Sequence, residues 1–332
     1  MGSDVIIVGG GVVGLAAAHE LSRSGRRVTV VCADVPGGRQ SAGLTRIFRL
    51  AHADGALTQA AADSLVLWEE WEREAGRPLL ERVGLLLTGD MADREVHLAA
   101  HGGVQQGTGA RHPLAVPLQR WASETTGAAI RAEDTIRFLQ AGVSLRLGVV
   151  IGVDPHGITL ETGERISGDT VVVCAGPETY RIMGLPEPER MRSVRFSFAY
   201  VTAPASPPPC WINRDEALSE PFYAVPDGLD HYSVGLSGGA PASVPEASHI
   251  RDAHGRIVEI VRRVFPGLQP IAERAIACEF PLRVAAPSAA LAHDGWDVLE
   301  QDGVLGVTGP ALFKFAPLLG RVLTERLERV TA

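Results

Sequence analysis

Gly9, Gly11 and Gly14 have the spacing with which a chain binds the pyrophosphate of a dinucleotide. They follow an apolar run, residues 5–8, that predicts a strand, and they precede residues 15–24, which predict a helix. The first glycine permits a tight turn, the second lets phosphate approach the backbone, and the third lets the helix pack on the strand. The amino end of the helix attracts the phosphates. We therefore predict a dinucleotide site at this turn.

Asp34 is the candidate partner of the ribose hydroxyls. It stands twenty residues after Gly14, just beyond a β-branched run, residues 28–32, that predicts the second strand. That run ends in Cys32, where an acidic residue is usual, and Asp34 follows two positions later on the same face. The alternative is that Asp34 only starts a turn.

Lys314 is the single lysine among 31 lysine and arginine residues. Arginine is a wide planar fork that stays charged, whereas lysine is a slim point charge whose pKa can shift. This position is therefore predicted to require a lysine in a narrow site. The alternative is a surface lysine left over in an arginine-rich composition.

The composition describes a globular protein of 332 residues, 45% of them apolar and 21% charged, which is enough for one large core or two moderate ones. A net charge of −8 without a long basic run excludes nucleic acid and an anionic membrane as partners. We find no 18-residue apolar stretch and no signal sequence, so a cytoplasmic protein is expected. The four cysteines lie far apart, which predicts no metal site and no disulfide framework.

Later segments repeat the strand and helix pattern of the amino-terminal part. Residues 170–174 predict a buried strand that ends near Gly176, and residues 304–307 predict another strand, followed by a helix over 316–330. The fold class is therefore predicted as α/β, with a Rossmann-type domain built from both ends of the chain.

A second pattern fills the middle of the chain. Short strands between residues 191 and 287, with a helix over 248–264, predict an antiparallel-sheet substrate domain with covering helices. Residues 102–117 are rich in Gly, Gln and His and are expected to form a loop. The predicted boundaries are 1–85, 126–190 and 276–332 for the cofactor domain, and 86–125, shortened, and 191–275 for the substrate domain.

Four segments carry a resemblance to a known family. Residues 41–49 read Ser-Ala-Gly-Leu-Thr-Arg-Ile-Phe-Arg, and residues 171–176, 278–281 and 309–315 read Val-Val-Val-Cys-Ala-Gly, Cys-Glu-Phe-Pro and Gly-Pro-Ala-Leu-Phe-Lys-Phe. In this order they resemble the amine-oxidising flavoproteins typified by monomeric sarcosine oxidase, over nearly the whole chain. The ending at Asp34 is closer to the related D-amino-acid oxidases. The resemblance implies FAD as the dinucleotide.

The resemblance also implies roles for the basic segment and for the lone lysine. Thr45 and Arg46 lie against the isoalloxazine ring, where Arg46 supplies positive charge near the reduced, anionic flavin. Arg49 and Lys314 bind a substrate carboxylate, because a buried anion needs paired donors. The alternative is that Arg46 and Arg49 are surface arginines. The other implied cofactor contacts are Ser41, Val150, Gly176, Gly309 and Phe313.

Cys278 stands where some family members attach the flavin through a thioether, which implies possible covalent FAD. The alternative is a buried small side chain. Arg283 is either a third carboxylate ligand, as in the D-amino-acid oxidases, or a surface charge at a strand end. Tyr223 matches a residue that lines the substrate side of the flavin, with an ordinary strand tyrosine as the alternative.

Two departures from the family pattern bear on the reaction with oxygen. Ala42 stands where sarcosine oxidase has a histidine. Ser233 stands where the family usually has the lysine that helps reduced flavin react with oxygen, and a hydroxyl stabilises superoxide poorly. The protein is then a slow oxidase, passes electrons to another acceptor, or uses another cation such as Arg46.

The predicted function is FAD-dependent oxidation of a C–N bond, with hydride transfer to flavin N5 to give an imine. The expected substrate is a small carboxylate-bearing amine, such as an N-methyl, cyclic or free amino acid, with oxygen or another acceptor taking the electrons. The alternatives are an NAD(P)H-using flavin monooxygenase and a catalytically degenerate flavoprotein. The oligomeric state stays open, with a monomer favoured.

Overall fold

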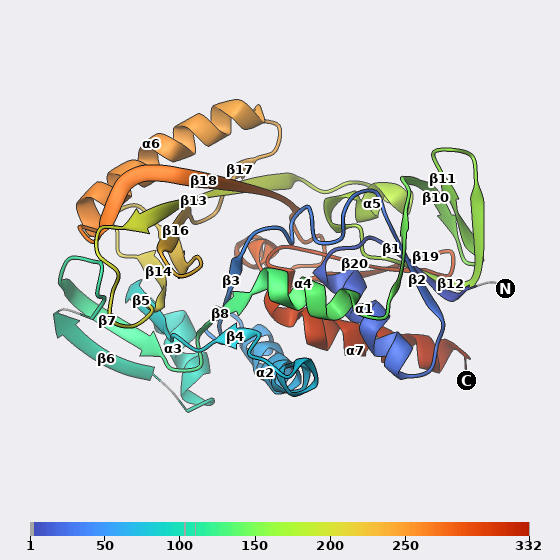
Figure 1. Cartoon of the computed structure of the whole chain (residues 1–332), viewed down its shortest axis with the longest axis horizontal. Coiled ribbons are helices and arrows are strands. Elements are labelled where there is room, and N and C mark those ends of the chain that lie inside the picture. Colours follow the sequence, from blue (N-terminus) through green and yellow to red (C-terminus); the bar gives the residue numbers. More distant parts are fainter. Residues whose placement is uncertain (1–2, 103, 110, 332) are drawn as a thin grey trace.

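The computed structural model describes residues 3–102, 104–109 and 111–331 (Figure 1). One half of the molecule contains an eight-stranded sheet with the path β10-β11-β12-β1-β2-β9, in which β20 pairs with β12 and β19 pairs with β20. Strands β9, β2, β1, β12 and β20 run parallel to one another, whereas β10, β11 and β19 are added in antiparallel pairings. The strands are β1 Ser3–Val8, β2 Val28–Cys32, β9 Ser144–Leu147, β10 Val150–Asp154, β11 Gly157–Leu160, β12 Arg165–Val173, β19 Asp297–Gln301 and β20 Val304–Thr308.

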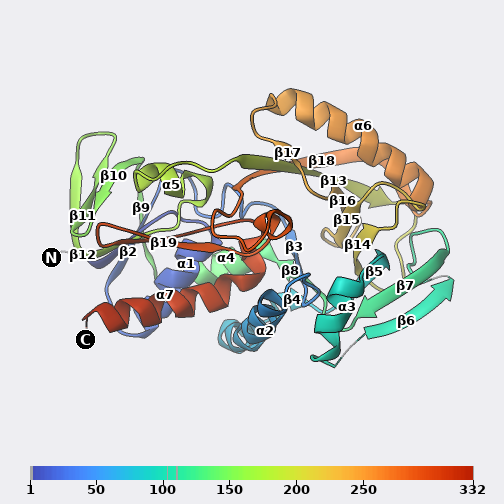
Figure 2. The same cartoon turned by 180° about the vertical axis from the view of Figure 1, so that it is seen from behind.

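Strand β1 is apolar throughout because both of its faces are buried. Val5 and Ile7 pack in a core shared with helices α1 (Val12–Arg23), α4 (Ala132–Gln140) and α7 (Ala316–Thr331). Ile6 and Val8 pack on the other side, with α5 (Thr179–Ile182) and with β10 and β11. Successive side chains of a strand point to opposite faces, so this sheet requires a continuous apolar run. Figure 2 shows α1 and α7 side by side below the sheet.

The other half of the molecule contains a nine-stranded sheet with the path β17-β13-β16-β15-β14-β5-β7-β6, in which β18 pairs with β13. All of its pairings are antiparallel except that of β5 with β14, which is parallel. The strands are β5 Leu85–Gly89, β6 Val104–Gly109, β7 Leu118–Glu124, β13 Arg190–Tyr200, β14 Cys210–Arg214, β15 Phe222–Pro226, β16 His231–Leu236, β17 Ala240–Pro241 and β18 Leu268–Pro281.

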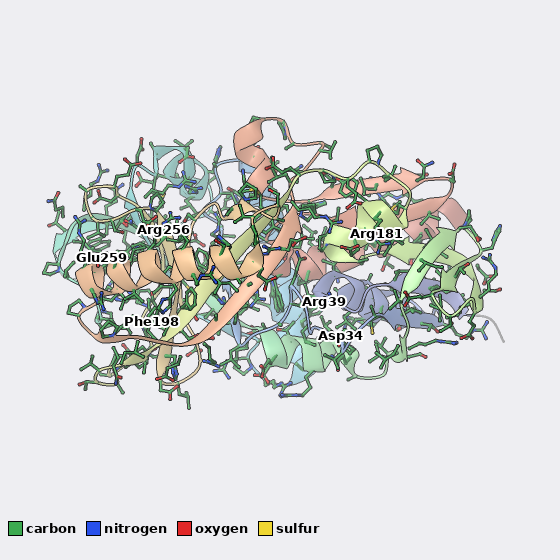
Figure 3. All side chains as sticks on the ribbon, turned by 90° about the horizontal axis from the view of Figure 1, so that it is seen from above. Asp34, Arg39, Arg181, Phe198, Arg256 and Glu259 are labelled. Carbon is green, nitrogen blue, oxygen red and sulfur yellow. The ribbon has the colours of Figure 1, made fainter. Side chains whose placement is uncertain are left out.

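Helix α6 (Glu246–Val264) covers the sheet over β13 and β18. Ala253, Ile257 and Val261 recur at helical spacing and pack with Phe196 and Phe198 of β13 in one core. Figure 3 looks down on this helix, with Arg256 and Glu259 on its length. The long pair β13 and β18 runs from below α6 towards the eight-stranded sheet, so it links the two halves of the molecule (Figure 1).

A small sheet holds the basic segment that the sequence analysis singled out. Strand β3 (Thr45–Phe48) pairs with β8 (Ala128–Arg131), which also pairs with β4 (Leu80–Glu81). Helix α2 (Gly55–Ala75) follows β3, and Asp54 begins it by accepting a hydrogen bond from Leu57 N. The remaining short helices are α3 Ala92–Ala99, η1 Gly176–Glu178, η2 Ala289–His293 and η3 Leu312–Phe315.

The predicted fold class is confirmed, with three corrections to its elements. Residues 102–117 are not only a loop, because they contain β6; residues 103 and 110 lie outside the described part. The sheet of the second half is not purely antiparallel, because β5 pairs parallel to β14. Strand β18 was missed, because its exposed glutamate, glutamine and arginine side chains hide any alternation. The division into domains stays a prediction.

Within the described part of the chain, no helix combines the length and apolar character needed to cross a membrane.

Candidate active site

The glycine turn between β1 and α1 is packed tightly at two points and open at one. At Gly9, whose φ is +114°, a Cβ would lie 2.3 Å from the carbonyl oxygen of Cys174, and at Gly14 it would lie 2.0 Å from that of Gly9. At Gly11 the nearest atom is Ser41 Oγ, at 3.5 Å. The first and third glycines therefore serve close packing, and the second leaves room for a ligand beside the backbone.

The amino end of α1 has the features of an anion site. Gly11 precedes the helix and offers no side-chain cap, and Val12 N donates to Ser41 Oγ at 3.0 Å. Ser41 was predicted to contact the cofactor, and it lies at this helix end. The amino end of a helix carries a partial positive charge. The open space at Gly11 and this end together fit the pyrophosphate of a dinucleotide.

Asp34 lies beyond the end of β2, with about half of its side chain exposed. Its Oδ1 accepts a hydrogen bond from Val35 N at 2.7 Å, and its Oδ2 lies 4.0 Å from Arg39 Nε. Figure 3 shows Asp34 and Arg39 beside each other. The hydrogen bond from Val35 N supports the alternative that Asp34 starts a turn. The side chain is nevertheless half-exposed, so a ligand could still reach the carboxylate. A role in binding ribose stays a prediction.

Gln40 has a buried side-chain amide close to Gly176, without a hydrogen-bond partner in the described part of the chain. Its Nε2 is buried and has no hydrogen-bond partner among the described residues. Its Oε1 lies 3.0 Å from the position that a Cβ on Gly176 would take, so glycine at 176 keeps this space free. Buried amides are normally paired. An unpaired donor beside the glycine turn fits a cofactor that carries many acceptor atoms, as FAD does.

Arg46 and Arg195 place two positive charges on one backbone carbonyl. Arg46 Nη1 and Arg195 Nη2 donate to Thr45 O at 2.7 and 2.8 Å. Arg46 Nη2 also donates to the carbonyls of Gln40 and Ala42, and neither arginine has an ion pair with an acid in the described ranges. Burial, together with the charge of Arg195, lowers the pKa of Arg46 to about 10. Arg195 is buried, Arg46 is half-buried, and the charge of the buried Asp227 acts on both without forming an ion pair with either. The positive charge left in excess favours an anionic ligand.

Aromatic and sulfur groups surround these two arginines. The Arg46 guanidinium lies 5.8 Å from the centre of the Phe313 ring. Cys278 Sγ lies 3.9 Å from Gln40 O, the same carbonyl that Arg46 contacts. Burial raises the pKa of the Tyr223 hydroxyl, and Gly235 opposite this ring is required, because a Cβ there would lie 2.5 Å from Tyr223 Cζ. The sequence-predicted residues Arg46, Tyr223, Cys278 and Phe313 thus gather in one region.

Ser233 is fully buried and does not present a free hydroxyl to this region. Its Oγ donates to Asp227 Oδ2 at 2.8 Å and lies 2.8 Å from Ser197 Oγ. Burial alone would raise the pKa of Asp227, but the hydrogen bond from Ser197 and the charge of Arg195 outweigh it and lower this pKa. Arg195 lies on β13, the strand that pairs with β16, which carries Ser233. It supplies a buried cation close to the position where the family usually has a lysine.

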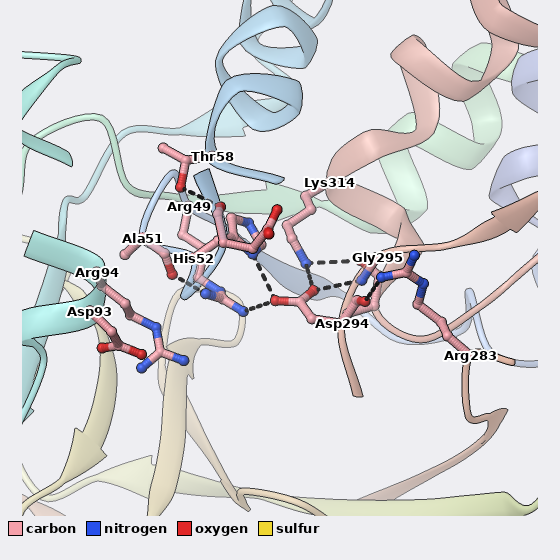
Figure 4. Close-up of polar contacts among 12 residues, drawn as sticks. Arg49, Ala51, His52, Thr58, Asp93, Arg94, Arg283, Asp294, Gly295 and Lys314 are labelled. Atoms are coloured by element: carbon pink, nitrogen blue, oxygen red, sulfur yellow. Dashed lines mark hydrogen bonds and ion pairs between the residues drawn. The ribbon is translucent and has the colours of Figure 1, made fainter. Parts of the chain in front are cut away.

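A second cluster brings Arg49 and Lys314 together on one carboxylate, that of Asp294 (Figure 4). Arg49 Nη2 and His52 Nδ1 lie 2.8 and 2.7 Å from Asp294 Oδ2, and Lys314 Nζ lies 3.2 Å from Oδ1. Lys314 Nζ also donates to Ala311 O at 3.1 Å. The lone lysine therefore lies in a narrow buried site, as its type predicted, and not on the surface.

The protonation states in this cluster follow from burial and from charge. Burial alone would raise the pKa of the Asp294 carboxyl. The charges of Lys314 and Arg49 and the hydrogen bond from His52 outweigh burial and hold this pKa well below its ordinary value, so Asp294 is ionised. Burial lowers the pKa of Lys314 to about 8 and that of His52 to about 3. His52 is thus neutral, and Arg49 and Lys314 exceed Asp294 by one positive charge.

Buried hydrogen bonds fix the two segments that carry these cations. Ser64 Oγ and Trp68 Nε1, both on α2, donate to Lys314 O at 2.7 and 2.9 Å. The Glu124 carboxylate, at the end of β7, accepts from Leu50 N and Ala51 N at 2.7 and 3.0 Å. The backbone on both sides of the cluster is therefore held by elements from distant parts of the chain.

Arg283 belongs to the edge of this cluster. Its Nη1 donates to the backbone oxygen of Asp294 at 3.0 Å, and its Nε lies 3.2 Å from Asp297 Oδ1. The interpretation of Arg283 as a surface charge is wrong, because only 14% of the side chain is exposed and it forms this buried ion pair. Like Arg49, it already has a carboxylate partner.

The remaining predicted residues have supporting positions. Gly309, with a φ of +151°, passes so close to Gly295 that a Cβ would lie 2.6 Å from its carbonyl oxygen. Val150 is buried at the start of β10 and faces Leu160, and Gly176 O accepts a hydrogen bond from Thr308 Oγ1 at 2.7 Å. His52, Asp294, Arg195 and Arg94 belong to these clusters and were not predicted from the sequence. For Arg195 a signal existed, since an arginine interrupts the apolar run Val194–Phe198.

Comparison with known proteins bears on the cofactor. The sequence model of a protein family described as FAD dependent oxidoreductase matches residues 4–326. The chain belongs to this family. The glycine turn, the helix end and the unpaired Gln40 amide of this FAD-dependent oxidoreductase fit the cofactor. The resemblance found in the sequence is thereby confirmed.

Relatives of this FAD-dependent oxidoreductase include an N-methyl-L-tryptophan oxidase of Escherichia coli, which is 26% identical over 361 aligned positions, 97% of this chain and 94% of that protein. A monomeric sarcosine oxidase of Bacillus sp. is 35% identical over 89 residues, 26% of this chain and 23% of that enzyme. Among solved structures, NikD, an unusual amino acid oxidase essential for nikkomycin biosynthesis, superposes with a TM-score of 0.83 at 21% identity, covering 98% of this chain and 93% of that one. The last likeness shows the fold.

Proposed function

We propose that this FAD-dependent oxidoreductase oxidises the C–N bond of a small amine that carries a carboxylate. The convergence of Arg49 and Lys314 on one carboxylate carries the proposal, because it demonstrates that their donors can meet on such a group. Arg49 and Lys314 carry two positive charges and Asp294 carries one negative charge. The substrate carboxylate would neutralise the remaining positive charge. The relatives named as oxidases of N-methyl and amino acids support the same reaction class.

The residues of the chain act mainly by positioning. Arg49 and Lys314 hold the substrate carboxylate, while Asp294 keeps both side chains at fixed places. The oxidation takes a hydride from the carbon, the nitrogen releases a proton to water, and an imine is left. Bound FAD supplies the hydride acceptor. Holding the donor carbon in a near-attack geometry contributes about 7–11 kcal/mol at best, so no side-chain base is needed.

Arg46 and Arg195 take the place of the missing lysine in this proposal. Their guanidiniums share Thr45 O beside Cys278 and Tyr223, where the flavin ring is expected. A fixed positive charge there favours the negative charge that the ring gains on reduction. With this positive charge, oxygen can accept the electrons although residue 233 is a serine. The alternative is that the electrons pass to another acceptor.

An anaerobic screen of amines tests the proposed function. Carboxylated amines are expected to bleach the flavin absorbance of the purified holoprotein, while their decarboxylated counterparts act far more slowly. Bleaching by NADPH instead would support a monooxygenase, and the absence of bleaching by any amine would contradict amine oxidation.

We infer that the FAD is attached through Cys278. The Cys278 sulfur lies 3.9 Å from Gln40 O, the carbonyl that the Arg46 guanidinium also contacts, so it lies in the region where the flavin ring is expected. After acid precipitation, the pellet of the wild-type protein is expected to stay yellow and that of Cys278→Ser to be colourless. The buried Cys210 on β14 provides the control, since Cys210→Ala should leave the pellet yellow. A colourless wild-type pellet would show that the cofactor is bound without a covalent bond.

Carboxylate binding is expected to weaken as the pH rises through about 8, the value to which burial lowers the pKa of Lys314. The protonated amine binds the anion, so affinity is retained below this pH and lost above it. His52, with a pKa of about 3, stays neutral through this range and makes no contribution. Titration of the holoprotein with butyrate at pH 6–10, followed by flavin absorbance, measures the change. In Lys314→Met the affinity should be low and independent of pH; a similar inflection in that variant would assign it to another group.

A further inference from the structure

Arg94 is a buried cation that the proposed reaction does not yet use. It lies in the first turn of α3 and is 6% exposed. Its Nη1 lies 3.3 Å from Met91 Sδ, and its Nε is buried without a hydrogen-bond partner. Across residues 3–102, 104–109 and 111–331, no carboxylate forms an ion pair with it. Burying a guanidinium without an ion pair costs free energy, unless a bound anion supplies the missing negative charge.

Arg94 faces the cluster that binds the carboxylate. Figure 4 shows its guanidinium beside that of Arg49, on the side of Arg49 away from Lys314. Burial and then the charge of Arg49 lower the pKa of Arg94 to about 10, which places the two cations within electrostatic reach of each other. Two neighbouring guanidiniums repel each other, so this arrangement needs negative charge between or beside them.

The acidic groups nearby supply only part of that charge. Asp93 is nearly half exposed and lies 4.0 Å from Arg214. Glu124 holds the backbone at Leu50 and Ala51, and burial raises its pKa. Asp294 is already shared by Arg49 and Lys314. The charges of Asp93 and Asp294 act on Arg94, but burial and the charges of Arg49 and Arg214 outweigh them. Since no carboxylate of the described residues forms an ion pair with Arg94, a ligand carboxylate can still bind there.

We propose that Arg94 forms a second anion subsite, so that the substrate is an amine with two carboxylates. One carboxylate binds Arg49 and Lys314 beside Asp294, and the other binds Arg94, which has no carboxylate partner among the described residues. An amino acid with an acidic side chain and an imino diacid both have this chemistry. The inference rests on the proposed function, because it adds a second anchor to the same site.

Binding of two four-carbon acids to the FAD-loaded protein tests the subsite. Butyrate and succinate differ by one carboxylate, and their dissociation constants follow from titration of the flavin absorbance at constant ionic strength. The wild-type protein is expected to bind succinate at least about tenfold more tightly than butyrate, because the second carboxylate gains a charge-assisted hydrogen bond. Arg94→Met should remove this preference, because it weakens succinate binding more than butyrate binding, and Arg94→Lys should restore part of it.

Arg214→Met provides the matched control, since Arg214 is a neighbouring but half-exposed arginine, and it should keep the preference for succinate. An equal affinity for both acids in the wild-type protein, or a preference that survives in Arg94→Met, would overturn the second subsite. The proposed function is reported separately by butyrate, whose binding should be lost in Arg49→Met and retained in Arg94→Met. If neither acid binds the wild-type protein, both the subsite and the carboxylate anchor are wrong.

Discussion

Arg49→Met is expected to lower kcat/KM for a carboxylated amine by about 100-fold, the loss of roughly 2.7 kcal/mol that a charge-assisted contact with a buried anion contributes. Methionine keeps the apolar stem of the side chain and removes the guanidinium. Asp294 and Lys314 then form a neutral pair, and no excess positive charge is left at that place for the substrate. Steady-state kinetics, with KM and kcat separated, measure the effect.

The same variant should act normally on an amine that lacks the carboxylate. This substrate gains nothing from Arg49, so its slow turnover should be the same in the wild-type and variant proteins. An equal loss on both substrates would instead indicate that Arg49→Met disturbs the fold around Asp294 and His52. An unchanged KM for the carboxylated amine would remove Arg49 from the substrate site.

Arg195→Met is expected to slow the reaction of the reduced holoprotein with oxygen by about 100-fold, similar to the loss of one preorganised donor at a site of developing negative charge. Arg195 is 5% exposed and shares Thr45 O with Arg46. Its removal leaves Arg46 as the one cation bound to that carbonyl in the described residues. The flavin potential should also fall by about 30 mV or more, which corresponds to about 1.4 kcal/mol for two electrons. Stopped-flow reoxidation and a redox titration measure the two effects.

Arg274 provides a control for this second prediction. It lies 3.2 Å from Asp227, which Arg195 also influences, but its side chain is 44% exposed. Arg274→Met removes a charge from the Asp227 network and none from Thr45 O, so the potential and the oxygen reaction should stay as in the wild-type protein. Equal changes in both variants would assign the effect to Asp227.

The fold was predictable where local sequence and packing agree. The glycine turn, the apolar run of β1 and the last helix each follow from residue type and spacing, and the structure has them. Strand β18 was not predictable in this way, because most of its side chains are exposed or half-exposed and its partner β13 lies about 80 residues earlier in the chain. Its pairing is a tertiary property that no short window of sequence contains.

The candidate site was predictable only in part, for the same reason. Arg49 and Lys314 could be paired before the structure, because the lysine is unique and the resemblance supplied its partner. Asp294 and His52 could not, since a single aspartate and a single histidine have no spacing that indicates a contact 242 positions apart. Arg94 gave no signal either, because its isolation is visible only once the surrounding carboxylates and their distances are known.

The contact between α1 and α7 has a consequence for how the protein forms during synthesis. Helix α1 is completed by residue 23, yet it packs on α7, where a Cβ on Gly320 would lie 2.8 Å from Ala16 O. On the ribosome, the apolar face of α1 therefore lacks this partner until residues 316–331 have emerged. A nascent chain with such an exposed face is prone to association. We expect chaperone dependence to be greatest late in translation, and cofactor capture to follow release of the chain.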